Sequence, residues 1–116
     1  MIYRAINRRT GRLIAGRVRV AQDLKSRHVG LLNRGSMGVD EGLLIKPCNS
    51  IHTFFMKFAI DVVFLSRQGM AVKIVKNIKP FRLESCHIKG YMTLELTGGV
   101  LKEFDIRIGD YIDFVV

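Results

Sequence analysis

The sequence has few of the features that mark secreted or membrane proteins. It contains two cysteines, Cys48 and Cys86, which are too few for a disulfide framework. No apolar run reaches the roughly 20 residues that a membrane-spanning helix needs. Arg4, Arg8 and Arg9 interrupt the N-terminal segment, residues 1–12, before the apolar core of a signal peptide develops. We therefore expect a cytoplasmic protein with reduced thiols and no membrane span.

The sequence also lacks the glycine motifs of nucleotide-binding proteins. Gly98 and Gly99 form the one glycine pair, and it has neither the lysine and hydroxyl residue of a phosphate loop nor the spacing of a dinucleotide fingerprint. We therefore expect no cofactor.

Acidic residues are scarce at the start of the chain. Residues 1–36 contain nine Lys or Arg against one acid, Asp23, whereas the rest of the chain contains ten against nine. The net charge of +9 therefore belongs to a local basic patch. This patch predicts either a solvated face or a site for an anionic polymer such as nucleic acid, and its candidate residues are Arg4, Arg8, Arg9 and Arg12. No helix-turn-helix or zinc-finger motif accompanies these arginines.

The chain has the composition and length of one folded domain, residues 1–116, with 48% hydrophobic and 25% charged residues. Short segments with alternating or continuous apolar residues predict strands. They lie at residues 2–7, 13–20, 42–46, 51–58, 60–65, 70–75, 91–96 and 111–116. Helical spacing is confined to residues 21–33 and 100–104. We expect a mostly β protein, a compact barrel or sandwich of seven to nine short strands with one or two short helices.

The block at residues 47–65 contains the polar residues that a core alone does not explain. In a strand over residues 51–58, His52, Phe54, Met56 and Phe58 would share one face. Asp61 interrupts the apolar run at residues 60–65. Its carboxylate is either a ligand-facing group with a raised pKa, an acceptor for backbone N–H groups near Ala59, or the partner of a basic side chain.

Several motifs of the chain occur together in one known family. These are Arg-His-Val-Gly-Leu-Leu at residues 27–32, Asp-Glu-Gly-Leu-Leu at 40–44, His-Thr-Phe-Phe-Met-Lys at 52–57, Ile-Asp-Val-Val-Phe-Leu at 60–65, Leu-Glu-Leu at 94–96 and Ile-Gly-Asp at 108–110. With them the sequence resembles the uncharacterised bacterial and archaeal family DUF192. Many relatives have Trp at Phe55, Pro at Ala59 and Asp at Ser66. The resemblance implies a compact β-rich fold and brings no agreed substrate, cofactor or catalytic residue.

These patterns favour a non-enzymatic module that binds a small molecule or a protein segment. The candidate ligand-binding residues are His52, Met56, Lys57, Asp61 and Glu41. Like Glu95 and Asp110, Glu41 falls within a family motif near a strand end. The alternative to ligand binding for these acids is a role in a turn or a cap.

An enzyme is the second hypothesis for the same block. A small hydrolase-like or metal-assisted enzyme would use Asp61 and His52, with Cys48 as a further candidate. Two Cys and two His are sufficient in number for tetrahedral zinc, namely Cys48, His52, Cys86 and His87, but their spacing differs from that of zinc ribbons and fingers.

Overall fold

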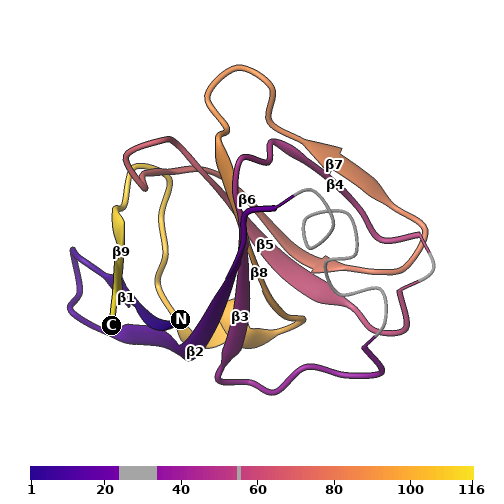
Figure 1. The fold of residues 1–116 in the computed structure, drawn as a ribbon, viewed down its shortest axis with the longest axis horizontal. Coiled ribbons are helices and arrows are strands. Elements are labelled where there is room, and N and C mark those ends of the chain that lie inside the picture. Colours follow the sequence, from indigo (N-terminus) through magenta and orange to yellow (C-terminus); the bar gives the residue numbers. More distant parts are fainter. Residues whose placement is uncertain (24–33, 55) are drawn as a thin grey trace.

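The computed structural model describes residues 1–23, 34–54 and 56–116, and within these ranges nine strands form most of the fold (Figure 1). The strands are β1 (Ile2–Asn7), β2 (Leu13–Ala21), β3 (Glu41–Ile45), β4 (Ser50–His52), β5 (Ile60–Leu65), β6 (Ala71–Ile78), β7 (Leu83–Ser85), β8 (Met92–Thr97) and β9 (Ile112–Val115). Seven of them form one sheet in the order β6-β5-β8-β3-β2-β1-β9, in which β2 and β3 run parallel. β4 and β7 form a separate two-stranded sheet. The mostly β, barrel-like fold class is confirmed.

The large sheet curls until its two end strands meet. Met70, just before β6, forms a β-bridge with Tyr111, just before β9. The amide of Ile112 also donates to the carbonyl of Gly69, 2.9 Å away. Gly69 has φ +90°, and a Cβ there would lie 3.0 Å from the carbonyl oxygen of Ile112. The closure therefore requires a glycine in the turn between β5 and β6.

Two hydrophobic clusters lie on opposite faces of the curled sheet. Val63 and Leu65 of β5 belong to the cluster inside the curl, whereas Ile60, Val62 and Phe64 belong to a second cluster on the outer face. The second cluster includes Ile51 of β4 and Met56, so it lies between the large sheet and the β4–β7 sheet. Because both of its faces are covered, the sequence of β5 is a near-continuous apolar run, interrupted by Asp61.

The predicted strand over residues 51–58 is wrong beyond its first two residues. β4 ends at His52, and the amide of Met56 donates to the carbonyl of Thr53, which closes a turn. As a result Phe54 is exposed whereas Met56 is buried, although alternation had placed them on one face.

The helical prediction at residues 100–104 is confirmed by a short 3-10 helix, η1 (Val100–Glu103), which buries Val100 and Leu101. The predicted helix at residues 21–33 lies mainly outside the described residues. None of the helices in the described part is long and apolar enough to cross a membrane.

Candidate functional site

Asp61 is a structural acceptor at one end of the curled sheet. Its side chain is fully buried, and Oδ1 accepts a hydrogen bond from the amide of Asn77 at 2.7 Å. Oδ2 accepts from the amides of Gly99 and Leu101 at 3.1 and 2.8 Å. The carboxylate therefore joins the ends of β6 and β8 and the start of η1 to β5. His52 is exposed on β4, so the structure does not bring Asp61 and His52 to a shared surface.

Exposed rings cover the end of the β4–β7 sheet. The ring centroids of His52 and Phe54 are 5.4 Å apart and stacked, and that of Phe81 lies 6.5 Å from Phe54. Leu83 faces His52 across the pairing of β4 with β7. The exposed fractions of Phe54, Phe81 and Leu83 are 41%, 64% and 65%. We call these four residues, His52, Phe54, Phe81 and Leu83, the ring surface.

Thr53 holds the two segments of the ring surface together. Its Oγ1 donates to the carbonyl of Lys79 at 2.6 Å and accepts from the amide of Arg82 at 2.9 Å. Its own amide donates to the carbonyl of Arg82, and its carbonyl accepts from the amide of Phe81. Thr53 is fully buried, so these bonds are shielded from water and fix the backbone that carries the exposed rings.

Phe81 has a backbone conformation that favours glycine. Its φ is +66°, in the left-handed region, where a side chain with a Cβ costs about 1 kcal/mol or more. The ring is nevertheless largely exposed, so its own burial does not offset this cost. Strain of this kind gathers at binding sites, where the surrounding structure imposes it.

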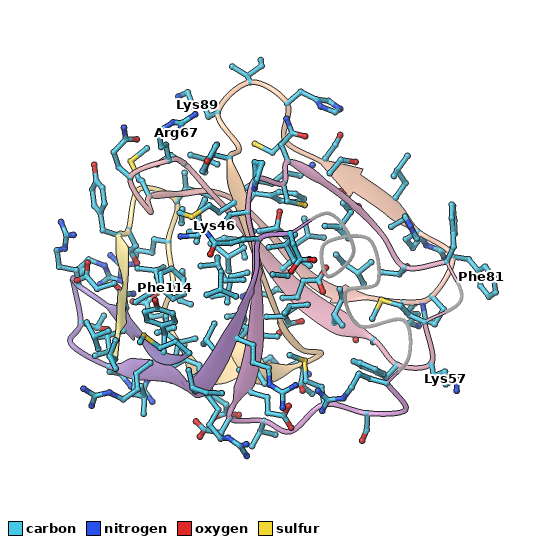
Figure 2. All side chains as sticks on the ribbon, viewed as in Figure 1. Lys46, Lys57, Arg67, Phe81, Lys89 and Phe114 are labelled. Carbon is cyan, nitrogen blue, oxygen red and sulfur yellow. The ribbon has the colours of Figure 1, made fainter. Side chains whose placement is uncertain are left out.

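The two segments that carry the ring surface are basic. Residues 50–60 and 76–83 contain four Lys or Arg and no Asp or Glu; the cations are Lys57, Lys76, Lys79 and Arg82. All four are exposed. Figure 2 shows Phe81 and Lys57 projecting outward at the same end of the molecule. The ring surface therefore lies on two segments in which every charged side chain is a cation.

The other two predicted ligand-binding residues are engaged within the fold. Met56 belongs to the cluster between the two sheets. The Glu41 carboxylate accepts hydrogen bonds from the guanidinium of Arg34 at 2.9 Å and from the amide of Gly38 at 3.1 Å, and these bonds lower its pKa. Glu41 thus stabilises the turn before β3.

The predicted zinc ligands do not form a cluster. Cys48 and Cys86 are half-buried free thiols, and Cys48 Sγ lies 3.2 Å from the carbonyl oxygen of Ser50. In the described ranges no three His, Cys, Asp or Glu side chains lie close enough together to hold a metal ion. Cys48, His52, Cys86 and His87 are therefore not arranged as a tetrahedral ligand set.

Three of the four candidate anion-binding arginines contact the C-terminal part of the chain. Arg8 pairs with Asp113 at 2.7 Å, and Arg9 pairs with Asp110 at 2.8 Å. Arg12 lies over the ring of Phe104 and donates to the carbonyl of Glu103. Arg4 is exposed on β1.

These contacts offset part of the basic patch. The Arg9 guanidinium and the amides around the Asp110 carboxylate hold its pKa at about 2, so it stays ionised. A count of charges along the sequence could not show this, because the paired acids lie about a hundred residues away.

The comparison with known families agrees with the motifs. The profile of the family DUF192, described as "Uncharacterized ACR", matches residues 5–114. The chain belongs to this family. A UPF0127 protein of Thermococcus sibiricus is 32% identical over 117 residues, which cover 96% of this chain and 74% of that protein.

Two solved structures share the fold of this DUF192 chain. One is a protein of Sinorhizobium meliloti described as a "putative transcription regulator", with a TM-score of 0.84 and 24% identity over 97% of this chain and 91% of that one. The other is a Novosphingobium aromaticivorans protein of unknown function, with a TM-score of 0.81 and 18% identity over 97% and 84% of the two chains. At these identities the likeness shows the fold alone.

The Leu-Glu-Leu motif contributes a residue whose burial the sequence did not show. Glu95 lies in the middle of β8, opposite Leu43 of β3 and Val62 of β5, and its exposed fraction is 5%. Among the described residues its carboxyl has no hydrogen-bond or ion-pair partner. Burial raises the pKa of Glu95 to about 7. Its neighbours Leu94 and Leu96 point to the opposite face of β8, inside the curl, so they gave no sign that the face carrying Glu95 is also covered.

Proposed function

We propose that the chain is a non-enzymatic binding module that holds a short acidic segment of a partner protein on the ring surface. The observation that supports this is the exposed ring cluster itself, together with the buried Thr53 that holds its two segments. Rigid exposed aromatic side chains are the usual anchors of protein interfaces, because they bury much area with little loss of side-chain entropy.

The composition of the ring surface favours a peptide over other partners. Leu83 adds an aliphatic side chain on which a nucleic-acid base gains little by stacking, whereas an apolar side chain of a peptide can pack against it. The four cations of these two segments favour acidic residues on either side of that apolar anchor. The partner segment therefore has one or more apolar residues flanked by Asp or Glu.

The contacts of the predicted catalytic residues give less support to the enzyme hypothesis. Asp61 is occupied by three backbone amides, and the contact of the Cys48 thiol is a backbone carbonyl rather than a base. Nucleophilic catalysis needs a nucleophile and a base within hydrogen-bond reach.

Selection from a phage-displayed library of random short peptides tests the proposal. We expect the selected peptides to combine apolar and acidic residues, and the affinity of a synthetic selected peptide, measured by fluorescence anisotropy, to fall about tenfold or more in Phe81→Ala and Leu83→Ala. Ile108→Ala is the matched control, because Ile108 is also an exposed apolar side chain, at 62%, but lies in the turn before β9.

Two outcomes would overturn the proposal. One is equal peptide affinity in wild type and Phe81→Ala. The other is binding of oligo(dT) that Phe81→Ala abolishes while no peptide is selected, which would make the ring surface a single-stranded nucleic-acid site.

A further inference from the structure

A cavity of about 330 Å³ opens at the end of the curled sheet where β3 ends. Its inner wall includes Leu44, Met92 and Ile112, which belong to the cluster inside the curl. Tyr3 of β1 and Phe114 of β9 also line it and are partly buried. The volume lies within the range of roughly 300–1,000 Å³ that is typical of small-ligand pockets. The apolar side chains and rings on this wall fit a small aromatic or aliphatic group, and most of the remaining lining is polar.

Lys46 is the charged group on the β3 side of this cavity. Gly42 and Leu44 point to the inside of the curl, and Lys46 continues that alternation one position past the end of β3. The residue is half-buried, and its ammonium group has no hydrogen-bond or ion-pair partner within the described ranges. A half-buried lysine without an acidic partner is a ready receptor for an anionic ligand group.

Arg67 supplies a second positive charge at the cavity. It lies in the turn between β5 and β6, with its guanidinium carbon 4.0 Å from the centroid of the Tyr91 ring. The acid in the cavity lining, Asp113, is occupied, because both of its oxygens accept hydrogen bonds from Arg8. Figure 2 shows Lys46, Arg67 and Phe114 on the side of the central strands that carries β9.

We propose that this cavity binds a small amphipathic anion, with its apolar body against Leu44, Met92 and Phe114 and its carboxylate or phosphate between Lys46 and Arg67. The site is separate from the ring surface, since the two share no residue. It takes a ligand of a different class, a free small molecule rather than a protein segment. Aromatic and short aliphatic carboxylates or phosphate monoesters are the compounds that match it.

Titration of the full chain by NMR tests this site with four defined probes. The two anionic probes are phenylacetate and phenyl phosphate, and they separate carboxylate from phosphate recognition. Phenylacetamide is the neutral match of the first, and phenethylamine is a cationic probe of similar size. We expect the amide resonances of Lys46, Gly69 and Phe114 to shift with at least one anion and to move far less with the other two compounds.

Variants then test the role of each charge. Lys46→Met keeps the length of the side chain and removes its charge, and we expect it to weaken binding of the better anion about tenfold. Arg67→Met, at an exposed turn residue, should weaken binding in the same direction without affecting the fold. Lys102→Met is the matched control, since it removes the charge of an exposed lysine outside this cavity.

The proposal is overturned if phenylacetamide binds as tightly as phenylacetate, because the charges would then contribute nothing. It is also overturned if the affected amides lie away from the cavity, or if Lys102→Met weakens binding as much as Lys46→Met. None of these outcomes depends on whether the ring surface binds a peptide.

Discussion

Replacing Glu95 by Gln should make the protein more stable at alkaline pH. The carboxyl of Glu95 has no partner in the described part of the chain, so nothing there offsets the loss of hydration when it ionises. Burial raises its pKa from the ordinary 4.5 to about 7. The folded state therefore binds this proton more tightly than the unfolded state does.

The shift determines both the sign and the size of the effect. A difference of two to three pKa units corresponds to about 3 kcal/mol, since one unit is worth about 1.4 kcal/mol. Below pH 4.5 Glu95 is protonated in both the folded and the unfolded state, and its burial costs no ionisation energy. As the pH rises from 4.5 through 7, only the unfolded state ionises freely, so the free energy of unfolding falls. Neutral Gln has nearly the shape and polarity of protonated Glu, so Glu95→Gln should come within about 1 kcal/mol of the wild type at pH 5 and exceed it by up to about 3 kcal/mol at pH 9.

Urea unfolding followed by far-ultraviolet circular dichroism measures this difference, because the chain has no tryptophan for fluorescence. Glu103→Gln is the matched control, since Glu103 is exposed in η1 and its replacement should leave the pH dependence of the wild type unchanged. An equal free-energy difference between Glu95→Gln and wild type at pH 5 and pH 9 would refute the reasoning.

Three further substitutions test the contacts that build the fold and the ring surface. Asp61→Asn should lower the free energy of unfolding by about 2 kcal/mol or more in chemical denaturation. The NH2 group of Asn would replace one carboxylate oxygen, and it cannot accept the hydrogen bonds that backbone N–H groups donate to that oxygen. Phe81→Gly should be about 1 kcal/mol more stable than Phe81→Ala, since only glycine is relaxed at φ +66°, and equal melting temperatures would contradict this. Asp110→Asn should destabilise the protein at neutral pH. Contact with Arg9 lowers the pKa of Asp110 to about 2, so the loss in free energy of unfolding relative to the wild type should shrink as the pH falls from 3.8 toward 2. A loss that persists at pH 2 would show that the charge of Asp110 is not its cause.

Local patterns predicted the strands well because each strand of the large sheet has at least one covered face. The alternation at residues 13–20 and the near-continuous apolar run at residues 60–65 both follow directly from burial on one or two faces. The sequence also singled out His52 and Lys57, which lie at or near the exposed rings. It failed where a residue's partner is remote along the chain.

Thr53 and the arginines show why such partners escape a reading of the sequence. Alternation continues past His52, but Thr53 bonds to Lys79 and Arg82, so the strand ends and Phe54 and Met56 separate. Arg8 and Arg9 look like free cations until the sheet places β9 beside β1. Neither contact has a local signature, because each depends on the order of strands in space.

Mapping a selected acidic peptide onto the protein by NMR tests the proposed function most directly. If the peptide binds as proposed, the amide resonances of residues 52–54, 79 and 81–83 shift on titration, and those of Lys46 and Phe114 stay in place. Phe81→Ala then removes the shifts while its spectrum remains that of a folded chain. Shifts that avoid residues 52–54 and 79–83, or that persist in Phe81→Ala, would contradict the assignment of binding to the ring surface.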